Sequence, residues 1–118
     1  MGQSQQLGRR GEQAAGEYLT ARGMVVVARN WRCRHGEIDI IAREGATLVF
    51  CEVKTRSGLG FGAPVGAITP SKRARLRRLV GQYLADTGGH MGPVRIDAVG
   101  ILWPRSGPPT VEHLQDVA

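Results

Sequence analysis

Four charged residues stand at strand-like spacing in two neighbouring, largely apolar segments. Glu37 and Asp39 lie two residues apart in GEIDIIAR, and Glu52 and Lys54 lie two apart in TLVFCEVKT. Side chains at that spacing share one face of a strand, where opposed carboxylates repel unless a cation lies between them. Mg²⁺ binds one or two carboxylates together with waters and a phosphate oxygen. A neighbouring lysine can orient the attacking water or offset charge on the phosphate, so the pattern indicates metal-dependent phosphoester chemistry.

The two segments are predicted to form an antiparallel hairpin, with strands over residues 36–43 and 47–55. The turn between them has two possible registers. A two-residue loop at 45–46 sets Asp39 opposite Glu52, whereas a loop shifted by one residue sets Glu37 opposite Glu52. Either register gathers the three carboxylates and the ammonium group on one face of the sheet.

A reading without chemistry also fits this spacing. In the first of the two registers Glu37 faces Lys54, and the two would form an ordinary cross-strand ion pair on a solvated face of the hairpin. The strand that carries Glu52 is otherwise strongly apolar, however, which favours a central position in a sheet.

The remaining elements must position this hairpin. A helix is expected over residues 7–22, where Gly11 falls on the apolar face and indicates a close approach to a neighbouring element. Thr69 is an expected N-cap and Pro70 suits the first helical position. Three further strands are expected: one over 24–29 covered on both faces, one over 94–102 and a weak edge strand within 110–117. A glycine-rich loop is expected over 56–68. A second helix is expected from Pro70 to the glycines at 88–89, with its apolar stripe at Leu76, Leu79, Val80, Tyr83 and Leu84.

These elements predict a single α/β domain over residues 1–118, with a core over about 7–102 and a Pro-rich C-terminal extension over 103–118. Their order is αβββαβ around a central mixed sheet flanked by helices. The segments GEIDII and CEVKTR match the D…ExK core of the PD-(D/E)XK nuclease superfamily, whose restriction-endonuclease-like fold has the same order. Over roughly residues 7–102, from GRRGEQAAGEYL to RIDAVG, the chain resembles the uncharacterised bacterial YraN-type family. One departure from the superfamily pattern is that no proline precedes Asp39.

The resemblance implies roles for individual residues. Asp39, Glu52 and the main-chain carbonyl of Val53 would hold Mg²⁺ or Mn²⁺, and Lys54 would be the catalytic lysine. Glu12, on the first helix, matches an acidic residue that such nucleases often contribute through a water. Its place on the flank of the apolar stripe is equally that of an ordinary exposed helix glutamate.

Charge indicates a polyanionic partner. The chain has 16 Lys and Arg against 10 Asp and Glu, a net charge of +6. Lys72 and Arg73 stand in the first turn of the second helix, where cations oppose the helix dipole, and phosphate contacts would explain them. A solvated cationic face is the alternative, with Arg75 and Arg78 opposite the apolar stripe. The candidate nucleic-acid-binding residues are Lys72, Arg73, Arg75, Arg78 and Arg56.

Composition narrows the classes of function. No apolar run approaches the ~20 residues needed to span a bilayer, and the N-terminal segment lacks a secretory signal, so we expect a cytoplasmic protein without a membrane partner. Cys33 and Cys51 form no CxxC pair, and Cys51 is expected to be buried. The expected function is metal-dependent endonucleolytic hydrolysis of DNA, with structure-specific cleavage as one form of it. RNA is not excluded as a partner, and a homodimer is suggested by analogy. Two alternatives stay open: a non-catalytic nucleic-acid-binding module of the same fold, and a protein-interaction domain.

Overall fold

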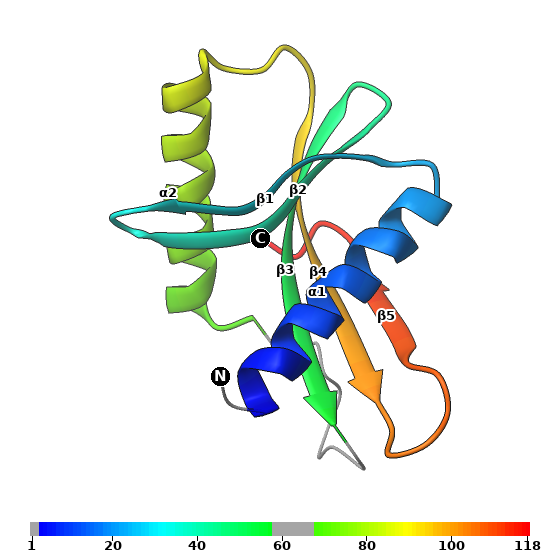
Figure 1. The fold of residues 1–118 in the computed structure, drawn as a ribbon. Coiled ribbons are helices and arrows are strands. Elements are labelled where there is room, and N and C mark those ends of the chain that lie inside the picture. The colour runs from blue at the N-terminus through cyan, green and yellow to red at the C-terminus, as the bar shows by residue number, and fades with distance from the viewer. Residues whose placement is uncertain (1–2, 58–67) are drawn as a thin grey trace.

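The computed structural model describes residues 3–57 and 68–118, which form one mixed sheet with a helix on each face (Figure 1). Helix α1 lies across one face and α2 lies against the other. The elements in chain order are α1 (Gln3–Ala21), β1 (Val25–Cys33), β2 (Gly36–Glu44), β3 (Thr47–Ser57), α2 (Pro70–Thr87), β4 (Val94–Trp103) and β5 (Thr110–Leu114).

The sheet has five strands in the order β1-β2-β3-β4-β5. Strands β3 and β4 are parallel, and every other neighbouring pair is antiparallel. The predicted α/β architecture and the central position of β3 are thereby confirmed, and the arrangement is compatible with a restriction-endonuclease-like fold. The expected edge strand near the C-terminus is also present, as β5.

Two apolar cores lie on opposite faces of the sheet. Ala15 and Leu19 of α1 pack on residues of β2, β3 and β4 that include Ile40 and Val49. The apolar stripe of α2 packs on the other face of the sheet, against residues that include Ile41 and Phe50. Gly11 confirms the expected close approach of α1, because a Cβ atom at this position would collide with the side chain of Thr55 on β3.

The ends of α2 follow from local signals in the sequence. Thr69 caps the helix by accepting a hydrogen bond from the Lys72 backbone N–H at 3.2 Å, and Pro70 occupies the first turn. Gly88 ends the helix in the left-handed conformation at φ 86°, donating its N–H to the carbonyl of Leu84. All five residues predicted to form the apolar stripe of this helix pack in the core on its side of the sheet.

Two expectations about the strands were wrong. Strand β1 was expected to be covered on both faces, but it is an edge strand with Val25 and Val27 exposed. The prediction failed because a β-branched run indicates extended backbone without specifying how many faces are covered. Strand β3 continues to Ser57, so Arg56 belongs to it and not to the following loop, and pairing with β4 extends over its whole end. The rest of the predicted glycine-rich loop, residues 58–67, lies outside the described residues.

The hairpin register is the first of the two expected. Glu44 pairs with Thr47, and the ladder runs from there to Ile40 and Cys51, which corresponds to a loop at 45–46. Beyond Cys51 strand β3 leaves β2 and continues along β4 alone, while β2 stays with β1. The two strands that carry the charged residues therefore separate at the point where those residues begin.

Side-chain alternation also breaks at this point. Ile38 and Ile41 are three residues apart on β2, yet both pack in the core beneath α2. On β1, Ala28 and Trp31 do the same, and between them Asn30 adopts a positive φ of 51°, a conformation that asparagine tolerates. Because of this break, the usual alternation of side chains along a strand does not predict which face of the sheet the residues before and after Asp39 occupy.

Candidate metal and nucleic-acid site

Asp39 lies where β2 and β3 separate. A continued ladder would pair Val53 with Ile38; instead the Val53 N–H donates to Oδ2 of Asp39 at 2.7 Å. The carboxylate thus replaces a main-chain acceptor in the opening between the strands. In an extended strand the N–H and C=O of one residue point to the same side, so the Val53 carbonyl is directed toward this opening as well.

The surroundings of Asp39 disfavour its charge. Burial raises the pKa of Asp39 to about 7, although the hydrogen bond from Val53 acts in the opposite direction. Part of this rise in the pKa comes from the negative charges of neighbouring Glu12, Glu52 and Glu37. The fold therefore brings all four carboxylates expected from the sequence within electrostatic reach of one another, and it supplies Asp39 with no direct cationic partner among the described residues.

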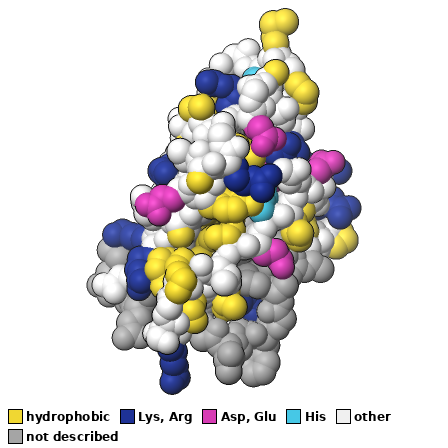
Figure 2. Space-filling model, turned by 90° about the vertical axis from the view of Figure 1, so that its right-hand side faces the viewer, with side chains coloured by type: hydrophobic (Ala, Val, Ile, Leu, Met, Phe, Trp, Pro, Cys, Tyr) yellow, Lys and Arg dark blue, Asp and Glu magenta, His cyan; other side chains and the backbone are white. Residues whose placement is uncertain are grey.

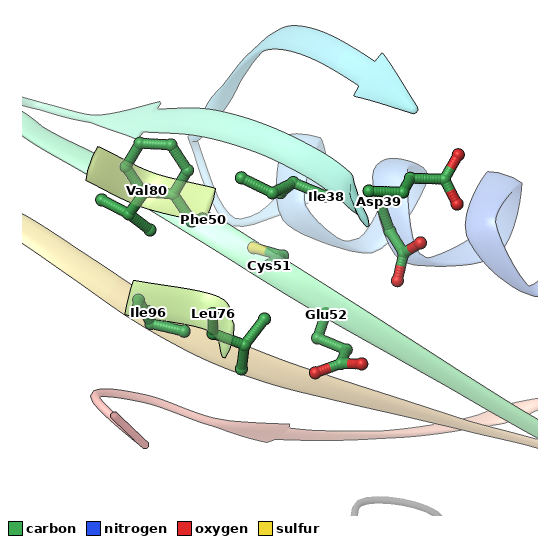
Figure 3. A pocket seen from close by; sticks show the side chains of 9 residues that line it. Ile38, Asp39, Phe50, Cys51, Glu52, Leu76, Val80 and Ile96 are labelled. Carbon is green, nitrogen blue, oxygen red and sulfur yellow. The ribbon is translucent and has the colours of Figure 1, made fainter. Parts of the chain in front are cut away.

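Glu52 lies beside Asp39 at the end of a narrow pocket. Figure 3 shows the two acids at one end, while Phe50, Leu76, Val80 and Ile96 form the apolar remainder beneath α2. Oε1 of Glu52 accepts contacts from α2, but Oε2 is buried and has no hydrogen-bond partner in the described part of the chain. A buried carboxylate oxygen without a partner is costly, so this atom is suited to accept a cation or a solvent molecule.

Glu12 and Glu37 form a second part of the site. Both line a groove between α1 and the β1–β2 hairpin. Burial and the charge of Glu37 raise the pKa of Glu12, and a hydrogen bond with the Asn30 side chain opposes this. Glu37 pairs with Arg32 of β1 at 2.8 Å, so the alternative interpretation, a cross-strand pair with Lys54, was wrong. Asn30 was missed in the sequence, where only its place before an aromatic and basic stretch distinguishes it.

Lys54 follows Glu52 on β3 and is exposed. It makes no ion pair with any residue that the structure describes, unlike the lysine and arginine of α2 that contact Glu52. Its ammonium group is therefore available to an anion from solution. The role that the family resemblance implies for it stays a prediction.

The cations of α2 divide into two groups. Lys72 and Arg75 turn toward the sheet and contact Glu52, so the expectation that Arg75 lies opposite the apolar stripe was wrong. Its long side chain extends past the edge of the helix to the site. Arg73 and Arg78 are exposed and make no ion pair within the described residues. On the face seen in Figure 2, which carries β5, Lys and Arg alternate with Asp and Glu, so that side is not a uniformly cationic surface.

The donor set fits a hard divalent cation. No cluster of three or more His, Cys, Asp and Glu side chains suited to hold a metal ion occurs in the described ranges. Asp39, the unpartnered oxygen of Glu52 and the Val53 carbonyl are nevertheless all oxygen donors, as Mg²⁺ and Mn²⁺ prefer, and Mg²⁺ ordinarily completes its shell with waters. A cation here would offset the repulsion that raises the pKa of Asp39.

Three other residues near these strands have structural roles. Trp31 is half-buried and packs edge-on against Tyr83, with ring centroids 5.4 Å apart. Cys51 is fully buried as expected, and burial raises the pKa of its thiol to about 12. Asp97 forms an ion pair with Arg95. Neither helix is long and apolar enough, over the residues described, to cross a membrane.

Comparisons with known proteins identify the family of this chain. Residues 11–101 match the model of the uncharacterised protein family UPF0102. The chain is 53% identical to a UPF0102 protein of Clavibacter michiganensis and 55% identical to one of Streptomyces griseus, over 95% of each chain in both cases. It is 48% identical to a UPF0102 protein of Nocardia farcinica, over 99% of this chain and 92% of that one. These names state membership of a family and no activity.

Proposed function

The chain belongs to the uncharacterised protein family UPF0102, and we propose that it is a metal-dependent endonuclease that hydrolyses phosphodiester bonds of DNA. One observation carries the proposal. Asp39 is held by the Val53 N–H in the opening between β2 and β3, beside a Glu52 oxygen that is buried without a partner. A merely structural pair of acids would cost stability at this place, whereas a metal-binding pair needs this geometry.

The chain's own residues divide the work. Asp39 and Glu52 would hold Mg²⁺ or Mn²⁺ with the Val53 carbonyl, and such an ion supplies Lewis-acid polarisation of a phosphate and a nucleophilic water near neutral pH. Lys54 offers an exposed ammonium group next to these ligands, where it can orient the water for in-line attack and offset charge developing on the phosphate. Glu12 bounds the site from α1 and acts through water rather than as a direct ligand.

Binding of the substrate backbone is assigned to α2. Arg73 and Arg78 are exposed on the helix whose other side packs beneath the site, and Arg56 lies further along β3, past Lys54. Arginine side chains in such positions contact phosphates without reading sequence, so they fix where the backbone lies on the protein. This arrangement suits recognition by shape, and we propose a structure-specific substrate such as a branch or flap.

The test is cleavage of a substrate panel by wild-type protein. Single-stranded, duplex, flap and four-way-junction DNA, and the corresponding RNA duplex, are incubated with Mg²⁺, with Mn²⁺ or with a chelator. We expect cleavage of at least one DNA structure with either metal and none with the chelator. Salt-sensitive binding without cleavage on any substrate would support the non-catalytic binding module instead, which the exposed arginines of α2 equally permit.

Lys54→Met tests the assignment of the lysine. The substitution removes the charge while retaining a long unbranched side chain at an exposed position, so folding should be unaffected. We expect the cleavage rate to fall by roughly 10²–10³-fold, the usual loss when one group that stabilises the transition state is removed. Affinity for the same substrate should change little, since at most one phosphate contact is lost.

Arg43→Met is the matched control for Lys54→Met. Arg43 is also exposed on the hairpin, near its turn, and the substitution removes one positive charge at a site without assigned function. It should cleave like wild type. Equal rates for Lys54→Met and Arg43→Met would remove Lys54 from the mechanism.

A further inference from the structure

Two cations of α2 converge on a single oxygen of Glu52. Nζ of Lys72 lies 3.3 Å from Oε1 and Nη2 of Arg75 lies 3.5 Å from the same atom. The side chain of Glu52 is 20% exposed, and those of Lys72 and Arg75 are 31% and 40% exposed. These contacts join α2 to β3 at the candidate metal ligand itself, and the other oxygen of Glu52 has no partner in the described chain.

The position of Lys72 is unfavourable for the helix alone. It lies in the first turn of α2, which contains no acidic residue, and a cation there opposes the helix dipole. The N-cap is Thr69, which accepts the backbone N–H of Lys72, and the ammonium group has no acceptor with which to cap the helix itself. The contact with Glu52 is the compensation that the structure provides, and it places positive charge where a metal ion would place it.

A divalent cation bound to Oε2 would add positive charge to the carboxylate that Lys72 and Arg75 already contact through Oε1. Like charges within about 4 Å repel strongly in a partly buried site, so metal binding must displace or weaken the contacts of Lys72 and Arg75. Once displaced, both side chains are cations without a partner on the same helix as the exposed Arg73 and Arg78. A phosphate of the substrate is the natural anion to receive them.

We propose that Lys72 and Arg75 compete with the metal ion for Glu52, and that binding of nucleic acid relieves this competition by drawing them onto a phosphate. The inference rests on the proposed function, since it requires a metal at Glu52 and a polyanionic substrate. It assigns Lys72 and Arg75 as positioning residues that couple the two binding events. By thermodynamic reciprocity, substrate then tightens metal binding by the same factor by which metal tightens substrate binding.

The first measurement is Mn²⁺ binding by calorimetry in the absence of nucleic acid. In the Lys72→Met/Arg75→Met protein the competing charges are gone, and we expect Mn²⁺ to bind about 3–10-fold more tightly than in wild type. Arg73→Met/Arg78→Met is the matched control, because it removes the same charge from the same helix without touching Glu52. A smaller gain in this control separates the direct contacts from the general effect of net charge.

The second measurement repeats the titration with a saturating duplex, with Lys54→Met added to every protein so that the DNA stays intact. DNA should tighten Mn²⁺ binding several-fold where Lys72 and Arg75 are present and clearly less where both are replaced. Thermal unfolding checks that the proteins are folded, and Lys72→Met alone provides a second variant whose stability should not fall.

The outcomes distinguish this inference from the function on which it rests. If wild type binds no Mn²⁺, or if Asp39→Asn binds Mn²⁺ as well as wild type does, the metal site itself is wrong. If that binding is present but Lys72→Met/Arg75→Met leaves it unchanged or weaker, or changes it no more than the Arg73→Met/Arg78→Met control, the metal site stands and the competition is overturned.

Discussion

Replacing Asp39 with asparagine is expected to abolish metal-dependent cleavage while making the metal-free protein more stable. The amide oxygen can still accept the hydrogen bond from the Val53 N–H, so the opening between β2 and β3 keeps its geometry. The negative charge is lost, however, and with it the affinity of the site for a divalent cation. We expect cleavage to fall by roughly 10³-fold or more.

The gain in stability follows from the sign of the pKa shift. Folding raises the pKa of Asp39 from 3.8 to about 7, so the folded protein resists ionisation of this group. The free energy of unfolding therefore falls as pH rises from about 4 to about 7, and it stays lower above that range. Asparagine carries no such cost, and at pH 8 Asp39→Asn should be more stable than wild type by on the order of 2 kcal/mol.

Chemical unfolding at pH 8 and at pH 4, with a chelator present, measures this effect. The difference between Asp39→Asn and wild type should shrink toward pH 4, where the wild-type carboxyl is protonated in the folded protein. Glu112→Gln is the control, since this exposed acid on β5 loses the same charge outside the site. If Asp39→Asn is less stable than wild type at pH 8, the Asp39 carboxylate stabilises the folded protein and must have a cationic partner.

The largest loss of stability is expected for Asp97→Asn. Asp97 is fully buried on β4, and both of its oxygens bond to the Arg95 guanidinium, at 2.8 and 3.0 Å. The His113 ring donates to it at 2.8 Å and the Asp116 N–H at 3.1 Å. An amide would turn an NH₂ group toward these donors and leave the Arg95 charge without its main partner, so we expect a loss of roughly 3–5 kcal/mol.

The pH dependence gives this prediction a second readout. Burial alone would raise the pKa of Asp97, but the hydrogen bonds from Arg95 and His113 outweigh burial and lower it. Its contribution to stability is therefore complete above the unfolded pKa of about 3.9 and is lost as pH falls through the lower folded value. Urea unfolding at pH 7 measures the main effect.

Asp86→Asn is the control for Asp97→Asn, because Asp86 is exposed near the end of α2 and its loss should cost less than about 0.5 kcal/mol. A similarly small loss for Asp97→Asn would show that the buried network on β4 does not hold β5 and the C-terminal residues to the sheet.

Sequence signals within a few residues of each other were sufficient to predict most of the helices and strands of this protein. Thr69, Pro70 and Gly88 bound α2 because capping and left-handed backbone are decided locally. The β2–β3 hairpin was also predicted locally, although the sequence left two registers open and the structure shows the one with a loop at 45–46. The apolar run in β3 predicted its central place, and Asp39, Glu52 and Lys54 could be singled out because two-residue spacing puts charged residues in register along strands.

Only the tertiary structure decided how those residues meet. The sequence does not show where side-chain alternation along a strand breaks. The break at Asn30 and the ion pair of Glu37 with Arg32 of β1 therefore could not be predicted. The contact of Lys72 with Glu52 depends on how α2 lies against the sheet, which packing of its apolar stripe sets and helix periodicity does not. Periodicity predicts which face of a helix or strand is apolar. Packing of those apolar faces against one another then decides which charged residues of different elements come into contact.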